Sequence, residues 1–247
     1  MGQFEGKVAY VTGAASGVGR ATVRRFAAEG ARVHGVDINA DGLAETAAEH
    51  GDEVTTAVVD ITDRDAVHGS VDAVAASLGR LDVVANVAGA IRMGHMTDVT
   101  QSEFDLMMRV NVEGMFWVSQ AAIPHLLETG GNIVNVASNA GLMGQAYSVV
   151  YCASKGAVVN MTKAMAMEYV KTNIRINAIA PGGMDTGMTD GIALPEDMDF
   201  ALMQPYMGFR GMAAPDTAAN AIAWLASEQA DRCTGSILSI DGGLAAG

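Results

Sequence analysis

The chain has 247 residues, of which half are hydrophobic, and it carries a formal net charge of −13 at pH 7. This acidic balance argues against a nucleic-acid-binding protein, because phosphate contacts require clustered lysine and arginine side chains. Charged residues interrupt every apolar stretch well short of the roughly 18 residues that cross a membrane, which argues against a membrane protein.

A single soluble domain over residues 1–247 is the expected organisation, since no linker, charge block or internal repeat divides the chain. The start of the chain lacks a basic segment followed by an apolar core, so no secretory signal is visible. The two cysteines, Cys152 and Cys233, have neither metal-ligand nor disulfide spacing and fit a reducing cytoplasm. The five histidines are scattered, and we therefore expect no metal site.

Strand and helix patterns alternate along the whole chain. A short apolar run at residues 8–12 precedes a glycine-rich segment at residues 13–19 and an amphipathic pattern at residues 20–29. Further strands are predicted at residues 32–36, 54–59, 83–86, 132–137, 175–180 and 236–240. Such alternation predicts a parallel sheet with helices on both faces and right-handed crossovers.

The first strand, the glycine turn and the helix after it form a candidate dinucleotide-binding unit. Glycines allow close backbone approach, so the turn and the helix N-terminus can lie against a pyrophosphate. The turn residues expected there are Gly13, Ser16, Gly17, Val18 and Gly19. Asp37 follows eighteen residues after Gly19, where a carboxylate can bind the adenosine ribose. Asp37 would repel a 2′-phosphate, and because Ile38 and Asn39 follow instead of a cation, NAD is favoured over NADP.

Further candidate site residues directly follow other predicted strands. Asp60 follows the third strand, Asn86 ends the fourth, Ser138 follows the fifth and Pro181 follows the sixth. In open parallel sheets the ligand crevice lies beyond the carboxyl ends of the strands, where the strand order reverses. These residues are therefore expected at one edge, although Asp60 would also suit a cap for the helix that begins around residue 64.

Tyr151 and Lys155 stand four residues apart on a predicted helix over residues 148–170. At that spacing two side chains share a helix face, with roughly 5–6 Å between their Cβ atoms. A tyrosine has a pKa of about 10, and one positive charge about 4 Å away at an effective dielectric near 20 lowers it by roughly three units. The spacing thus allows Lys155 to activate Tyr151, but it also fits a solvated lysine beside a half-buried ring.

Through these motifs the chain resembles the short-chain dehydrogenase/reductase family over nearly its whole length. The matching segments are Thr12-Gly13-Ala14-Ala15-Ser16-Gly17-Val18-Gly19, Asn86-Val87-Ala88-Gly89, Asn111, Ser138, Tyr151 with Lys155, and Pro181-Gly182-Gly183-Met184-Asp185-Thr186. Val87 stands where the family has a second asparagine, and we expect this position to serve packing and loop bracing.

The resemblance implies a single Rossmann-type domain with a doubly wound seven-stranded parallel sheet in the order 3-2-1-4-5-6-7. The implied catalytic residues are Asn111, Ser138, Tyr151 and Lys155. The implied cofactor contacts add Ile38, Asp60, Ile61, Asn86, Ala88, Gly89, Tyr151, Lys155, Pro181, Gly182, Met184 and Thr186 to the glycine turn and Asp37. In similar proteins Asn111 helps to hold a water near the lysine, although it can also simply accept a bend in the helix over residues 102–127.

The implied activity is reversible hydride transfer between NAD and a secondary alcohol or ketone. Tyr151 would exchange the proton, Ser138 would bind the substrate oxygen, and Lys155 would hold the nicotinamide ribose. Two alternatives stay open, a 3-oxoacyl-type reductase, which usually uses NADP, and a non-catalytic dinucleotide-binding redox sensor. Similar proteins form homotetramers through the two long helices and the C-terminal strand.

Residues 182–212 interrupt the α/β alternation and are expected to form a substrate lid. The segment holds six methionines: Met184, Met188, Met198, Met203, Met207 and Met212. Because methionine fills irregular apolar space, these residues with Met93, Leu142 and Met143 would suit an apolar or cyclic alcohol. Ordinary core packing explains single methionines equally well. Arg92 and Arg210 are the candidate contacts for a substrate anion.

Overall fold

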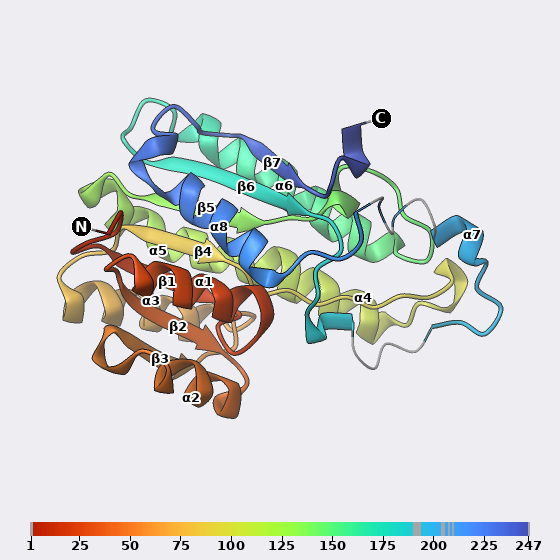
Figure 1. Cartoon of the computed structure of the whole chain (residues 1–247), viewed down its shortest axis with the longest axis horizontal. Helices are drawn as coiled ribbons and strands as arrows, with labels where there is room; N and C mark the ends of the chain where they lie inside the picture. Colours follow the sequence, from red (N-terminus) through yellow and green to blue (C-terminus); the bar gives the residue numbers. More distant parts are fainter. Residues whose placement is uncertain (1, 190–193, 204–205, 207, 209, 247) are drawn as a thin grey trace.

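The computed structural model describes residues 2–189, 194–203, 206, 208 and 210–246, and it is built around one seven-stranded parallel sheet (Figure 1). The strand order is β3-β2-β1-β4-β5-β6-β7, as expected. The strands are β1 Val8–Thr12, β2 Arg32–Asp37, β3 Val54–Val58, β4 Val83–Asn86, β5 Asn132–Val136, β6 Arg175–Pro181 and β7 Ile237–Ile240. Each predicted strand is present and ends within one residue of its predicted bounds.

Helices cover both faces of the sheet. One face packs against α1 Gly17–Ala28, α2 Ala40–Ala48 and α8 Pro215–Ala226. The other packs against α3 Arg64–Leu78, α5 Met115–Thr129 and α6 Val149–Glu168. Two short helices, α4 Gln101–Met108 and α7 Phe200–Met203, lie to the right of the sheet in Figure 1. The doubly wound fold of the sequence prediction is therefore confirmed.

The central strands are apolar on both sides because both sides are buried. In β1, Ala9 and Val11 belong to the core beneath α1 and α8, whereas Val8 and Tyr10 belong to the core beneath α3 and α5. Successive side chains of a strand point to opposite faces, so a strand between two helical layers reads as a continuous apolar run. For this reason the strands could be predicted from the sequence.

The long helix predicted over residues 102–127 is continuous but irregular. Between α4 and α5, residues Arg109–Gly114 form a π-helical segment that contains Asn111. A π-bulge inserts an extra residue into a turn, and such bulges occur frequently at functional sites. Asn111, for which the sequence left open a role in holding a water and a bend in the helix, therefore lies in a locally distorted turn.

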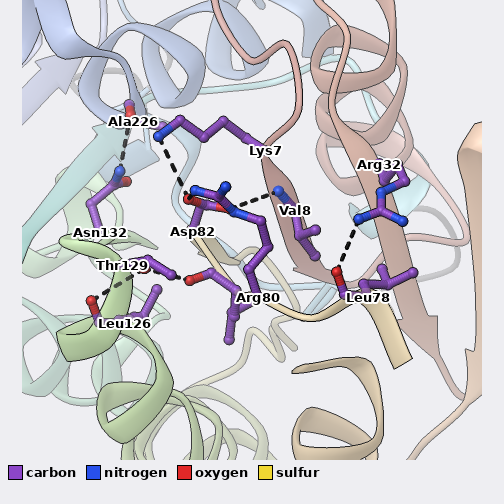
Figure 2. A network of polar contacts seen from close by, with 11 residues as sticks. Lys7, Val8, Arg32, Leu78, Arg80, Asp82, Leu126, Thr129, Asn132 and Ala226 are labelled. Atoms are coloured by element: carbon purple, nitrogen blue, oxygen red, sulfur yellow. Dashed lines mark hydrogen bonds and ion pairs between the residues drawn. The ribbon is translucent and has the colours of Figure 1, made fainter. Parts of the chain in front are cut away.

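The amino ends of the strands are held by polar contacts around a buried carboxylate, Asp82 (Figure 2). Asp82 accepts a hydrogen bond from the Val8 amide at 2.9 Å and two from the Arg80 guanidinium at 2.7 and 2.6 Å. Lys7 Nζ lies 3.6 Å from the same carboxylate. On the neighbouring strand β5, the Asn132 side chain donates to the Ala226 carbonyl. These contacts tie β1, β4, β5 and α8 together at one edge of the sheet.

Within the described part of the chain, none of the helices combines the length and apolar character that a bilayer crossing requires.

Candidate active site

A cavity of about 840 Å³ lies at the carboxyl edge of the sheet. Residues at or just beyond the ends of six strands line it: Gly13, Asp37, Asp60, Ala88, Ser138 and Pro181. The cavity therefore sits where an open parallel sheet offers a ligand crevice. Of all the predicted site residues, Asn86 and Asn111 are the two whose atoms do not line it.

The glycine turn leaves no room for side chains. A Cβ at Gly19 would lie 1.9 Å from the Gly13 carbonyl oxygen, and a Cβ at Gly13 would lie 2.9 Å from the Ala88 backbone. Gly13 also has a positive φ of 71°, which side chains disfavour. The turn thus brings bare backbone and the free amides of the first turn of α1 to the cavity wall, which suits a pyrophosphate.

Asp37, at the end of β2, is held rigidly beside that turn. Its carboxylate accepts hydrogen bonds from the Ala15 amide at 3.2 Å and the Asn39 amide at 3.0 Å. The side chain of Arg20 is turned to other partners, the carbonyls of Ala15 and Gly42 and the carboxylate of Glu45. Among the described residues that line the cavity, the cations are Arg92 and Lys155, so the part next to Asp37 presents a negative charge.

Asp60 lines the cavity but does not cap helix α3. Its carboxylate accepts a hydrogen bond from the Thr62 amide at 2.9 Å. The cap is Asp63, which accepts from the amides of Asp65 and Ala66 at 3.0 and 3.1 Å. The capping interpretation of Asp60 is wrong, because α3 begins at Arg64 and its first free amides lie above Asp63.

Tyr151 and Lys155 lie on one face of α6 and both line the cavity, as their spacing predicts. Both are buried, with 8% and 3% of their surface exposed. Lys155 Nζ lies 5.8 Å from the centre of the Tyr151 ring and donates a hydrogen bond to the Val136 carbonyl at 2.8 Å. Ser138, two residues beyond the end of β5, is buried on the same wall beside Tyr151.

The protein's own groups do not lower the pKa of Tyr151. Burial, which disfavours the phenolate, raises the pKa of Tyr151 to about 12, and the nearby Ser138 hydroxyl offsets this only in part. Burial likewise lowers the pKa of Lys155 to about 8. The spacing allowed Lys155 to activate Tyr151 through a charge about 4 Å away. In the structure the ammonium lies beside the ring, 5.8 Å from its centre, and is itself desolvated, so Lys155 does not offset the effect of burial on the pKa of Tyr151.

Asn111 acts behind the cavity wall. Its side-chain oxygen accepts from the Ala90 amide at 2.7 Å, and its nitrogen donates to the Ala90 carbonyl at 2.8 Å and the Ser154 hydroxyl at 3.0 Å. A Cβ at Gly89 would lie 3.2 Å from the Asn111 oxygen and 3.4 Å from Lys155 Nζ. Asn111 therefore fastens the loop after β4 to α6 next to Lys155.

Asn86 faces away from the cavity. Its side-chain nitrogen donates to the Ser119 hydroxyl at 3.1 Å and to the Asn135 side chain at 2.8 Å. These partners belong to α5 and β5, so the Asn86 side chain joins sheet to helix. The expected cofactor contact at this position has no support from the side chain.

Thr12 and Val136 support the site, and the sequence marked neither of them for that role. The Thr12 hydroxyl accepts hydrogen bonds from the amides of Val87 and Ala88, at 3.0 and 3.1 Å, and so joins the ends of β1 and β4. Val87 itself is buried in the core, which fits the packing role expected of it. The carbonyl of Val136 holds Lys155, and no sequence signal marks a backbone acceptor.

The described part of residues 182–212 contributes apolar side chains to the cavity. Its methionines there are Met184, Met188, Met203 and Met212, joined by Met93 from the loop after β4. Met198 is buried outside the cavity, Leu142 and Met143 do not line it, and Met207 and Pro205 lie outside the described residues. Arg92 reaches the cavity, whereas Arg210 packs against Gly242.

The segment of residues 194–203 contacts two neighbouring loops. The Asp199 amide donates to the Tyr147 hydroxyl at 2.9 Å, and His95 Nε2 lies 2.9 Å from the Asp197 carboxylate. This contact with His95 holds the pKa of Asp197 below its usual value. In the parts of the chain that the structure describes, no cluster of three or more histidine, cysteine or acidic side chains is placed to hold a metal ion.

The chain matches known proteins along almost all of its length. A family model described as enoyl-(acyl carrier protein) reductase matches residues 13–245. The 3-oxoacyl-[acyl-carrier-protein] reductase of Thermotoga maritima is 40% identical, covering 98% of this chain and 99% of that protein. The meso-2,3-butanediol dehydrogenase of Serratia marcescens is 37% identical, covering 99% and 96%. A crystal structure of a short chain dehydrogenase from Mycobacterium paratuberculosis bound to NAD superposes with a TM-score of 0.90 at 33% identity, covering 100% of both chains. The chain therefore belongs to the short-chain dehydrogenase/reductase family, whose enzymes act on CH–OH groups with nicotinamide cofactors.

Proposed function

We propose that this protein is an NAD-dependent oxidoreductase that interconverts a secondary alcohol and a ketone, with an apolar or cyclic substrate. The observation that carries the proposal is that Ser138, Tyr151 and Lys155 line the same cavity as the glycine turn and Asp37. A hydroxyl pair and an ammonium beside a dinucleotide cradle suit proton exchange with a substrate oxygen. A redox sensor without turnover would have no need of this constellation.

The residues present fit a dinucleotide, and they fit NAD better than NADP. The glycine turn would hold the pyrophosphate and Asp37 the adenosine ribose hydroxyls. Asp60, Ile61 and Ile38 would flank the adenosine, and the segment from Pro181 to Thr186 would flank the nicotinamide. A 2′-phosphate would meet the fixed carboxylate of Asp37, and the guanidinium of Arg20 is engaged elsewhere.

Bound NAD supplies the hydride acceptor and, in its oxidised form, a positive charge near the nicotinamide. In alcohol oxidation Tyr151 Oη takes the hydroxyl proton, and Ser138 Oγ hydrogen-bonds the substrate oxygen. Lys155 holds the nicotinamide ribose and keeps a positive charge beside the ring. Because the pKa of Tyr151 is about 12 from protein groups alone, we infer that the charge of oxidised NAD contributes to its activation.

The second candidate is a 3-oxoacyl-[acyl-carrier-protein] reductase, which the 40% identity to the Thermotoga maritima protein favours. The Serratia marcescens protein, at 37% identity, is named for a secondary alcohol instead. The methionine-lined cavity wall suits an apolar substrate under either reading. The carboxylate of Asp37 favours the first candidate, since 3-oxoacyl reductases usually use NADP.

A panel of secondary alcohols and ketones, assayed with NAD and NADP in parallel, tests the proposal. We expect turnover of cyclic or apolar secondary alcohols with NAD and at least about tenfold lower kcat/KM with NADP, because a charge repulsion of about 1.4 kcal/mol is tenfold. Turnover confined to 3-oxoacyl thioesters with NADPH would establish the second candidate and contradict the first.

Asp37 is expected to set the cofactor preference. Replacing its carboxylate in Asp37→Ser removes the repulsion, so the ratio of NADP to NAD efficiency should rise at least about tenfold. Asp41→Ser, an exposed carboxylate in the first turn of α2, is the matched control and should leave the ratio unchanged. An unchanged ratio in Asp37→Ser would show that some other group selects the cofactor.

We further propose that the protein is a homotetramer of the cytoplasm. Large apolar side chains remain exposed on the helices from residue 101 to 129 and around α6: Phe104, Phe116, Leu127, Val149, Met167 and Val170. Such surface is typical of subunit interfaces. Sedimentation is expected to give about four times the 25.5 kDa chain mass, and a monomer would contradict the assembly. The two cysteines are free thiols, as expected in a reducing compartment.

A further inference from the structure

Two amide side chains, Asn139 and Gln145, line the cavity next to the catalytic hydroxyls. The oxygen of Asn139 accepts a hydrogen bond from Ser138 Oγ at 3.2 Å and another from Gln145 Nε2 at 3.1 Å. Ser138 Oγ in turn accepts from the Ala140 amide at 3.1 Å. The three side chains thus form a hydrogen-bonded chain that begins at Ser138.

This chain leaves one polar atom unused on each amide. Asn139 is 96% buried, being 4% exposed, yet its nitrogen has no hydrogen-bond partner among the described residues, and the same holds for the oxygen of Gln145. Both residues line the cavity, and neither of these two atoms is among the fully buried side-chain atoms without a partner in the described part of the chain. Exchanging nitrogen and oxygen in both amides reverses their roles but still leaves one donor and one acceptor.

We propose that Asn139 and Gln145 form a polar subsite that binds a second substrate hydroxyl, carried by the carbon next to the reacting carbon. The substrate class is then vicinal diols and the corresponding α-hydroxyketones. This inference rests on the proposed function, because it places the reacting oxygen on Ser138 and Tyr151. It narrows the substrate from a secondary alcohol to one with a neighbouring hydroxyl.

One free amide atom donates and the other accepts a hydrogen bond, which favours a hydroxyl as the bound substrate group. A hydroxyl both donates and accepts, so it can satisfy the two amides at once, whereas a ketone or thioester carbonyl only accepts. A carboxylate would need a cation, and Arg92, which lines the cavity, is exposed and donates to the Ile91 carbonyl.

The position of the two free amide atoms favours a hydroxyl on the carbon next to the reacting carbon. Asn139 directly follows Ser138, and its amide bonds Ser138 Oγ through one of its two polar atoms. The free atom of the same amide therefore lies one amide group away from the hydroxyl that binds the reacting oxygen. This separation matches two oxygens on adjacent carbons better than two oxygens further apart.

The test compares three substrates of one skeleton with NAD: 1,2-cyclohexanediol, 1,3-cyclohexanediol and cyclohexanol. A site that hydrogen-bonds a substrate hydroxyl discriminates against analogues that leave its polar groups unpaired. For the natural protein we expect kcat/KM for the 1,2-diol to exceed the other two by at least about tenfold, since an unpaired buried group costs on the order of tenfold or more.

Gln145→Leu and Asn139→Leu remove the free amide atoms while keeping the side-chain size. Each is expected to lower kcat/KM for the 1,2-diol about tenfold, because the second hydroxyl loses a partner. Gln145→Leu, which removes no contact of Ser138, should change kcat/KM for cyclohexanol by no more than about threefold, because cyclohexanol does not use the subsite. Gln229→Leu, an exposed glutamine after α8, is the matched control and should change neither. Binding of NADH, followed by its fluorescence, reports whether each variant is folded.

Equal efficiency on cyclohexanol and the 1,2-diol in the natural protein would overturn the subsite but leave the proposed function standing. A preference for the 1,3-diol would overturn the vicinal geometry. Equal losses on the 1,2-diol and cyclohexanol in the variants would show that the amides act only through Ser138. No oxidation of any of the three would count against the proposed function as well. Should Asn139→Leu fail to fold, Gln145→Leu and the natural protein still decide the question.

Discussion

Burying the Lys155 ammonium costs electrostatic free energy and so lowers the stability of the folded protein. The side chain is 3% exposed, and its main compensation is the hydrogen bond to the Val136 carbonyl. Its pKa falls from 10.5 to about 8, so the folded protein releases this proton at a lower pH than the unfolded chain does. Stability therefore rises with pH between about 8 and 10.5, and at pH 7 the full cost is present.

Lys155→Met is expected to stabilise the protein while it removes activity. Discharging the buried site should raise the free energy of unfolding at pH 7 by about 2 kcal/mol, after the lost hydrogen bond is counted. This corresponds to about 4–8 °C in Tm, measured by calorimetry, and the gain should shrink as the pH approaches 10. Lys163→Met, an exposed position on the same helix, should leave Tm nearly unchanged. A Tm that falls in Lys155→Met would contradict this electrostatic account.

The single-residue chemistry was only partly readable from the sequence. Four-residue spacing predicts that Tyr151 and Lys155 share a face, which is confirmed. The burial that raises the pKa of Tyr151 could not be predicted, because spacing does not reveal how deeply a ring is buried. Asn139 and Gln145 were missed as well, since a contact across a loop leaves no periodic pattern.

At the scale of elements, the turn between β1 and α1 depends on its glycines. Because Gly19 has no side chain, its backbone can approach the Gly13 carbonyl closely, and helix α1 therefore begins close to the end of β1. This turn was predictable because glycine is required wherever backbones touch. The caps were less predictable, since Asp60 and Asp63 both precede α3 and the sequence does not rank them.

Gly19→Ala is expected to abolish cofactor binding, because its Cβ would lie 1.9 Å from the Gly13 carbonyl oxygen and must displace the turn. The affinity for NADH should fall at least about a hundredfold, on the scale of about 3 kcal/mol, measured by fluorescence titration. The matched control is Gly69→Ala on α3, where nothing lies within 4 Å of the new Cβ. The control should bind NADH normally and gain about 0.5–1 kcal/mol of stability. Normal NADH binding by Gly19→Ala would refute the close-approach argument.

At the scale of the whole molecule, stability and chemistry are concentrated at opposite edges of one sheet. The cavity lies at the carboxyl ends of the strands, and the Asp82 contacts lie at their amino ends (Figure 2). Buried parallel strands follow from the hydrophobic pattern, which explains why the strand positions were predictable, whereas the strand order was implied by the family resemblance. The cavity walls formed by residues 182–212 were not predictable, because an irregular segment has no period that places its side chains.

Asp82→Ala should therefore lower stability without impairing catalysis. The change leaves the buried Val8 amide and two cations without their acceptor, and the free energy of unfolding should fall by about 2 kcal/mol. Calorimetry should show Tm lowered by about 4–8 °C, with kcat/KM below the transition changed less than about twofold. Asp231→Ala, which breaks an exposed pair with Arg232, is the control and should change Tm little. A loss of catalysis at a temperature where Asp82→Ala stays folded would show that the Asp82 contacts and the catalytic site are not independent.

The most direct test of the central claim is the effect of Tyr151→Phe on oxidation of a responsive secondary alcohol with NAD. The account predicts that kcat/KM falls at least about a hundredfold, because general acid–base catalysis contributes about 10²–10⁴. NADH binding should stay within about twofold, since the ring keeps its place, and the part-exposed Tyr169→Phe at the end of α6 should behave like the natural protein. Turnover that remains unchanged in Tyr151→Phe would contradict the account.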